Sequence, residues 1–310
     1  ATREPHVLRT MYQAVIGGPD TSARPSCEAT LHAMLQRYVV HIHPIAVIGI
    51  LASYGSLKFS QEMARRGKFT MVWVPYTNPG HPLAVACRNA VDAFKAEHGQ
   101  APDVLLLENH GLFVSAATES RAVKLTKDIV ALCDKMFAER RKKMATPKLL
   151  SDDAILETIV ELRRALVEQG CAQRLVQAVP SELAAQLLAR KDARQMLGMN
   201  NTPDTLVYCL AHPLILAANH KGKIAAALAA YIKANREPPR VVLVPGYGFL
   251  VVADSQKALK TTVVVYQAQL GFFERSSAFG GSKPLKKSQA DYINNWEVEA
   301  YRRQIAKAEA

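Results

Sequence analysis

Short apolar runs alternate along the chain with longer segments in which apolar residues recur every three or four positions. The short runs predict strands, and the longer segments predict helices. Strands are expected at 39–44, 71–74, 104–107 and 112–114. Helices are expected at 29–36, 45–52, 82–98 and 119–141. Strands that alternate with helices in this way are typical of a layered α/β/α domain, in which helices cover both faces of one sheet.

Part of this pattern recurs in the second half of the chain. Pro102–Val114 (PDVLLLENHGLFV) aligns without gaps with Pro239–Val251 (PRVVLVPGYGFLV). Further upstream, Val39–Pro44 (VVHIHP) resembles Tyr208–Pro213 (YCLAHP). We interpret these matches as an internal duplication of one α/β unit, with a degenerate second copy.

The duplication divides the chain into three predicted parts. They are a first α/β domain at 1–148, a helical connector with the degenerate repeat at 149–275, and a C-terminal tail helix at 276–310. The connector, 149–196, is expected to be mostly helical. In the tail, Asp291–Ile305 has the apolar periodicity of an amphipathic helix.

Two histidines lie two positions apart in the first predicted strand. Side chains at His41 and His43 would leave the same face of that strand, about 6.6 Å apart along it. Such a pair can converge on one metal ion, or it can be two ordinary histidines of a strand. The proposed duplication sets three histidines against residues of the second copy: His41 against Leu210, His43 against His212, and His110 against Tyr247. Because the second copy lacks two of the three, we expect the chemistry to lie in the first.

The composition narrows the classes of partner. The 310-residue chain has a net charge of +12, which suits an anionic small molecule or nucleic acid. Its basic residues are spread out except at 140–143 and 286–287, so we expect no nucleic acid partner. The longest apolar stretch, Tyr38–Tyr54, is too short and too polar to span a membrane. Five cysteines without paired spacing indicate reduced thiols and a cytoplasmic protein.

Three ordered motifs resemble a known family. Pro25-Ser26-Cys27-Glu28, His41-Ile42-His43-Pro44 and Glu108-Asn109-His110-Gly111 together look like the class II aldolase/adducin family. In that family an acidic residue near a helix start precedes an H-x-H strand, and a later His-Gly turn supplies a third histidine. Other stretches resemble one branch of the family, the aldolase part of bifunctional rhamnulose-1-phosphate aldolase/lactaldehyde dehydrogenase proteins. These stretches are Val74-Pro75-Tyr76, Asn78-Pro79-Gly80, Val244-Pro245-Gly246 and the tail from Lys283 to Trp296.

The resemblance implies a metal-dependent lyase. His41, His43 and His110 would bind a divalent metal, with Zn²⁺ the first choice. Glu28 would be a fourth ligand or the general acid/base. The implied reaction is retro-aldol cleavage of a hydroxyketone, a sugar or sugar phosphate, through a metal-stabilised enediolate. Family members resemble cyclic tetramers, so a homo-oligomer, either a dimer or a tetramer, is expected.

Two other functions stay open at this point. A decarboxylase or dehydratase of a sugar acid would use the same metal site, and an adducin-like scaffold would use none. The glycine-rich phosphate-binding loop of the family should precede Glu28, and Gly17-Gly18 does not match it. We therefore expect that loop either to lie in an upstream segment or to be absent. Several other candidates are interpreted as structural residues. Ser26 is expected to be a helix N-cap, and no catalytic or ligand role is assigned to Cys27, His32, His81 or His212.

Overall fold

The computed structural model of the chain describes residues 3–17, 25–145, 147–172 and 175–296. The chain forms two compact units. Unit 1 comprises residues 1–51 and 56–136, and unit 2 comprises residues 52–55 and 137–310.

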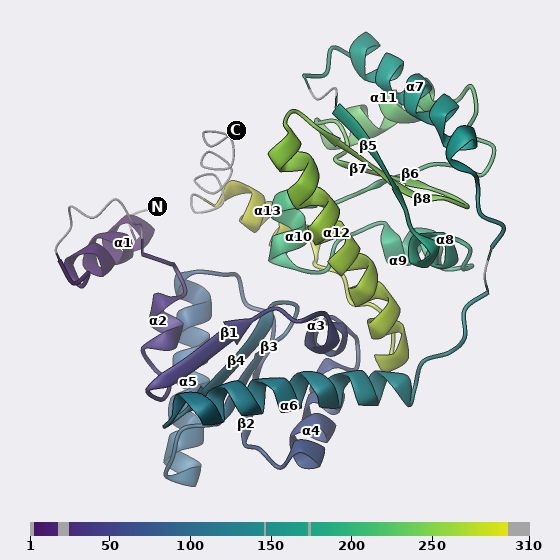
Figure 1. Cartoon of the computed structure of the whole chain (residues 1–310). Helices are drawn as coiled ribbons and strands as arrows, with labels where there is room; N and C mark the ends of the chain where they lie inside the picture. Colours follow the sequence, from purple (N-terminus) through teal and green to yellow (C-terminus); the bar gives the residue numbers. More distant parts are fainter. Residues whose placement is uncertain (1–2, 18–24, 146, 173–174, 297–310) are drawn as a thin grey trace. The chain divides into compact units, whose positions relative to one another are not determined.

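Unit 1 is a mixed α/β domain built on one four-stranded sheet. Its elements are, in order, α1 (Arg3–Gln13), α2 (Ala29–His32), β1 (Tyr38–Ile42), α3 (Ile45–Leu51), α4 (Ser56–Gly67), β2 (Met71–Val74), α5 (His81–His98), β3 (Val104–Leu107), β4 (Gly111–Ala116) and α6 (Glu119–Ala138) (Figure 1). The strand order is β1-β4-β3-β2, with only the β2–β3 pair parallel. The predicted strands and helices of this half are confirmed, although α2 is shorter than the predicted 29–36.

Helices cover both faces of this sheet. Leu105 and Leu107 of β3 and Phe113 of β4 pack in one core with apolar residues of α5 and of the α2 region. Because successive strand residues point to opposite faces, Leu106 of β3 belongs to the other side. Figure 1 shows α6 across that side of the sheet, opposite α5. There Cys133 of α6 approaches Met63 of α4, with 3.1 Å between the sulfur atoms. The domain therefore has the predicted three-layer arrangement.

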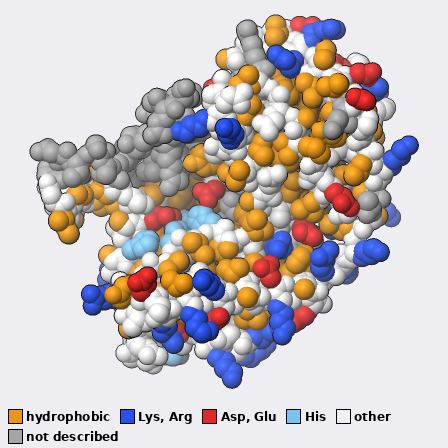
Figure 2. Space-filling view, viewed as in Figure 1, with side chains coloured by type: hydrophobic (Ala, Val, Ile, Leu, Met, Phe, Trp, Pro, Cys, Tyr) orange, Lys and Arg blue, Asp and Glu red, His pale blue; other side chains and the backbone are white. Residues whose placement is uncertain are grey.

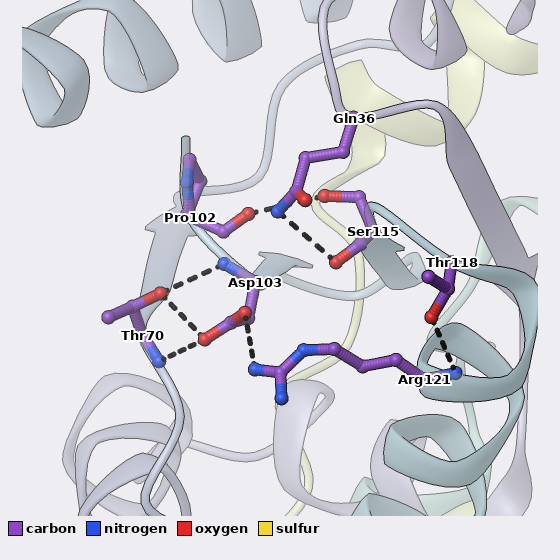
Figure 3. Close-up of polar contacts among 7 residues, drawn as sticks. All are labelled: Gln36, Thr70, Pro102, Asp103, Ser115, Thr118 and Arg121. Atoms are coloured by element: carbon purple, nitrogen blue, oxygen red, sulfur yellow. Dashed lines mark hydrogen bonds and ion pairs between the residues drawn. The ribbon is translucent and has the colours of Figure 1, made fainter. Parts of the chain in front are cut away.

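A polar network fixes one end of the sheet (Figure 3). The carboxylate of Asp103, just before β3, accepts hydrogen bonds from the backbone N–H and the hydroxyl of Thr70, at 3.0 and 2.9 Å. It also pairs with Arg121 of α6 at 3.2 Å. Ser115 of β4 donates to the carbonyl of Pro102 at 3.2 Å. These bonds tie β2, β3, β4 and α6 together at the end of the sheet away from the turn between β3 and β4.

Unit 2 is also a mixed α/β domain with a four-stranded sheet. Its elements are α7 (Asp152–Glu168), β5 (Leu175–Pro180), α8 (Glu182–Leu188), α9 (Ala193–Leu197), α10 (Pro203–Cys209), β6 (Leu214–Ile215), α11 (Ile224–Asn235), β7 (Val241–Val244), β8 (Gly248–Ala253), α12 (Gln256–Ser276), the 3₁₀ helix η1 (Ser277–Phe279) and α13 (Lys287–Asn295). The strand order is β5-β8-β7-β6, and only the β6–β7 pair is parallel. Apolar residues of α7 and α11 pack on one face, and those of α8, α9, α10 and α12 pack on the other.

The structure corrects the upstream part of the predicted alignment. The segment 149–196 was expected to be mostly helical, yet it contains β5, which pairs with β8 as β1 pairs with β4. Residues 208–213 instead form the end of α10 and the loop before β6. Leu210 and His212 therefore do not occupy the positions of His41 and His43.

The strand register gives the positions that would correspond if the two units are copies of each other. His41 lies opposite Phe113 of β4, and Ala178 lies opposite Leu250 of β8. In the interpretation of an internal duplication, the gapless alignment matches Phe113 with Leu250, so Ala178 would take the position of His41. Two residues further along β5, Pro180 pairs with Gly248, and in the same interpretation it would take the position of His43. The match of His110 with Tyr247 is retained, because each lies in the turn that joins the two central strands.

Two further predictions concern the whole chain. None of the helices within the described ranges is long and apolar enough to cross a membrane. The predicted tail helix 291–305 is represented by α13, which ends at Asn295, while residues 297–310 lie outside the described residues.

Candidate metal centre

The strand β1 brings the first two imidazoles together. His41 is in the strand and His43 follows its last residue, so both rings leave the same face, as the spacing predicts. The two Nε2 atoms lie 3.1 Å apart, and the ring centroids are 4.8 Å apart. The ring of His41 also stacks on Phe113 of β4, at 3.8 Å between centroids and 11° between planes.

The turn between β3 and β4 supplies the third imidazole. Asn109 adopts φ 56°, a left-handed conformation that asparagine tolerates better than most residues. Its N–H donates to the carbonyl of Leu51 at 3.1 Å, and the N–H of His110 donates to Leu107 at 3.1 Å. The turn directs the His110 ring toward the other two, with centroids 5.8 Å from His41 and 5.1 Å from His43.

Gly111 leaves space for the rings at the first position of β4. A Cβ atom built on Gly111 would lie 2.5 Å from Cδ2 and 2.9 Å from Nε2 of His43, and 3.1 Å from Cε1 of His41. Contacts this short require atoms to move. The arrangement of the rings therefore depends on a glycine at this position, because any side chain would collide with them.

Glu28 completes the group from the start of α2. Its Oε1 lies 3.0 Å from Nε2 of His110, and its Oε2 lies 3.5 Å from Nε2 of His41. One possible ligand atom from each of Glu28, His41, His43 and His110 lies within 4.8 Å of the others. Figure 2 shows histidine side chains gathered on one face of the molecule with acidic atoms beside them. The four residues singled out by the sequence are thus brought together.

The electrostatics favour the metal-binding forms of these side chains. Burial raises the pKa of Glu28, but its interactions with His110 and His41 outweigh that effect, so its pKa lies well below the ordinary value of 4.5. Burial is the main cause that lowers the pKa of His110 below 6.5, against the opposing effect of Glu28. Near neutral pH the site therefore presents a carboxylate and a neutral His110 imidazole.

The tautomer of His41 follows from its hydrogen bond. Its Nδ1 lies 3.0 Å from the carbonyl oxygen of Leu112, which can only accept, so Nδ1 carries the proton. Nε2 then presents a lone pair toward Nε2 of His43. A backbone carbonyl that orients a ligating histidine in this way is a common feature of metal sites.

The donor set fits a divalent cation. Three imidazole nitrogens with one carboxylate oxygen suit Zn²⁺ and other borderline metals. Bonds of about 2.0–2.1 Å place the ligand atoms of a tetrahedral site about 3.4 Å apart. The 3.1 Å between Nε2 of His41 and His43, and the 3.0 and 3.5 Å from Glu28 to its two partners, are near this value.

The remaining candidates lie around this centre without joining it. The His32 ring contacts Phe113 edge-on at 5.4 Å, which agrees with the interpretation of His32 as a structural residue. Ser26 accepts a hydrogen bond from the N–H of Glu28 at 3.2 Å, but the N-cap of α2 is Glu28 itself. In unit 2, Nδ1 of His212 donates to Gly198 at 2.7 Å. Sequence reasoning missed Phe113 as the residue that supports His41, although pairing the H-x-H strand with 112–114 would have indicated it.

The sequence of unit 1 matches a known domain family. Residues 4–136 match the family model described as "Class II Aldolase and Adducin N-terminal domain". The candidate metal centre lies within the residues that are similar to this domain family.

A curated relative extends the similarity along the chain. It is the "Uncharacterized oxidoreductase YuxG" of Bacillus subtilis (strain 168), 23% identical over 324 residues. The match covers 93% of this chain and 45% of the relative, so the chain spans about half the length of that protein.

Proposed function

We propose that unit 1 is a metal-dependent lyase that cleaves a hydroxyketone, a sugar or a sugar phosphate, by retro-aldol chemistry. The observation that carries this proposal is the convergence of three imidazole nitrogens and one carboxylate oxygen within 4.8 Å, in a class II aldolase/adducin-type domain. A structural scaffold has no need for such a group at the surface end of a sheet.

Each residue has a distinct part in this proposal. His41, His43 and His110 would hold the cation, for which we propose Zn²⁺. The cation would supply Lewis-acid polarisation of a substrate carbonyl. Glu28 would be a fourth ligand or the general base. Its lowered pKa keeps it ionised near neutral pH, which suits a ligand but makes the carboxylate a weak proton acceptor by itself. The Leu112 carbonyl and the Phe113 ring would keep His41 in its ligating orientation.

The name of the relative does not change this proposal. "Oxidoreductase" describes a protein of which this chain covers 45%. The donor set of unit 1 supports lyase chemistry by itself, and it also suits decarboxylation or dehydration of a sugar acid. The substrate assay described below separates these reactions by their products.

We further propose that unit 2 is a degenerate second copy of unit 1. The shared strand order, the shared strand directions and the left-handed turn residues Asn109 and Gly246 support this proposal. The positions of the three histidines are taken by Ala178, Pro180 and Tyr247, which offer no imidazole. Unit 2 would thus keep the fold without the metal centre. A homo-oligomer, dimer or tetramer, is part of the proposal, and light scattering tests it.

Metal content and substrate turnover test the function. Elemental analysis of protein purified without chelator should show about one divalent metal per chain. His110→Ala should lose the metal, and His212→Ala, a histidine of unit 2, should keep it. Wild-type metal content in His110→Ala would contradict the ligand assignment. A screen of hydroxyketones and sugar acids should detect carbon–carbon cleavage into two carbonyl products. Loss of CO₂ or of water instead would replace the retro-aldol assignment.

A further inference from the structure

A second candidate site lies in unit 2, apart from the metal-binding residues. It is a cleft of about 630 Å³ lined by residues of the end of α6, the loop after it, the last turn of α8 and the end of α12. Six cationic side chains line it: Arg140, Arg141, Lys142, Lys143, Arg190 and Lys191. The lining contains one carboxylate, that of Glu274.

Ion pairs neutralise only part of this charge. Arg190 makes two bonds of 2.8 Å to Asp192, and Arg140 lies 3.2 Å from Glu139. The carboxylate of Glu274 lies 3.7 Å from Arg275. Four cations of the lining, Arg141, Lys142, Lys143 and Lys191, have no ion pair with any residue that the structure describes, and all four are exposed.

The ends of helices do not account for these four charges. Basic residues are common at helix C-termini because each end carries about half a negative charge. The C-terminal turns of α6, α8 and α12 all contribute to the lining. Together these three helix ends carry about 1.5 negative charges. Four unpaired cations exceed that amount, so the cleft keeps a positive potential that favours an anion with several charges.

The aromatic rings near the cleft indicate what kind of anion fits. The guanidinium of Arg140 lies 6.0 Å from the ring of Phe279, and that of Arg141 lies 5.8 Å from the ring of Phe137. Both rings are buried, so neither offers an open face on which a base of a nucleic acid would stack. The volume is within the range of small-molecule sites. We propose that this cleft binds a small anion that carries two or more phosphate groups.

Calorimetric titration of the full chain at an ionic strength of about 0.15 M tests this proposal, because screening removes weak attraction between exposed charges. The probes are inorganic pyrophosphate, tripolyphosphate and orthophosphate. Binding should be strongest for tripolyphosphate and weakest for orthophosphate. Equal affinity for orthophosphate, or no binding of any probe by the wild-type chain, would overturn the proposal.

A matched pair of variants locates the site. Lys142→Ala/Lys143→Ala removes two exposed cations of the cleft, and its affinity for tripolyphosphate should fall at least about tenfold. Lys124→Ala/Lys127→Ala removes the same charge from exposed positions of α6, and its affinity should stay within about twofold of wild type. An equal loss of affinity in both variants would mean that only the net charge of the chain matters, and it would reject the cleft as the binding site. A single-stranded oligonucleotide that binds more tightly than tripolyphosphate, with the same dependence on Lys142 and Lys143, would also reject the small-anion assignment.

Discussion

Replacement of Gly111 by alanine tests the geometry of the candidate metal centre most directly. The new Cβ would lie 2.5 Å from Cδ2 of His43, whereas unbonded carbon atoms prefer about 3.5–4.0 Å. The His43 ring would have to move by about 1 Å. Functional geometry tolerates shifts of about 0.5 Å, so we expect zinc affinity to fall about 10–100-fold, as when support of a ligand is lost. The backbone of β4 should accept alanine, because glycine is the less favourable residue inside a strand.

The measurement is competition for Zn²⁺ against a chromophoric chelator, with circular dichroism as a check of the fold. Gly248→Ala is the matched control, since Gly248 begins β8 as Gly111 begins β4. The three atoms nearest to its Cβ would be backbone atoms of Val179, Pro180 and Ser181, and none of them belongs to a histidine. This control should lose stability and keep zinc affinity. A folded Gly111→Ala protein with wild-type zinc affinity would refute the reasoning.

Three further predictions concern unit 1. Phe113→Leu removes the 3.8 Å stack on His41 and should weaken zinc binding several-fold while costing less than about 2 kcal/mol of stability; unchanged affinity in the chelator competition would contradict a supporting role. Asp103→Ala leaves both donors of Thr70 without their acceptor and should lower the free energy of unfolding in urea by about 2 kcal/mol, against little change for Asp128→Ala on the exposed face of α6. Burial raises the pKa of Cys87 from 9.0 to about 12, so the unfolded chain loses this proton first and stability should fall as pH rises above about 9. Urea unfolding at pH 8 and pH 10 should show a smaller decrease for Cys87→Ala than for wild type, and an equal decrease would exclude this thiol.

The candidate site could be predicted because its residues lie in strong local patterns. His41 and His43 obey the two-residue period of a strand, and His110 follows a buried four-residue strand. The contacts that hold the rings were not visible in the same way. Gly111 and Phe113 matter only once β4 is placed beside β1, and that pairing joins residues about 70 positions apart.

The second half was predicted less well for a physical reason. β5 pairs with β8 alone among the described strands, and only one of its six residues is buried. An edge strand of this kind has a weak apolar pattern, and Pro180 at its end was interpreted as a break between helices. The similarity of residues 208–213 to the H-x-H strand then offered a false match. Strands β7 and β8, in which every residue is buried, lie within the segment 239–251 that was aligned with the strands of the first half.

The place of β1 in its sheet has a consequence for how the protein holds an ion. Among the described strands, β1 is hydrogen-bonded to β4 alone, so it is an edge strand of its sheet. Two of the three imidazoles therefore belong to a segment that is held by one neighbouring strand. A metal ion bound by His41, His43 and His110 would link this edge strand to the turn after β3. Chelation should therefore loosen residues 38–42 first, and amide hydrogen exchange there should accelerate well before the rest of the domain opens.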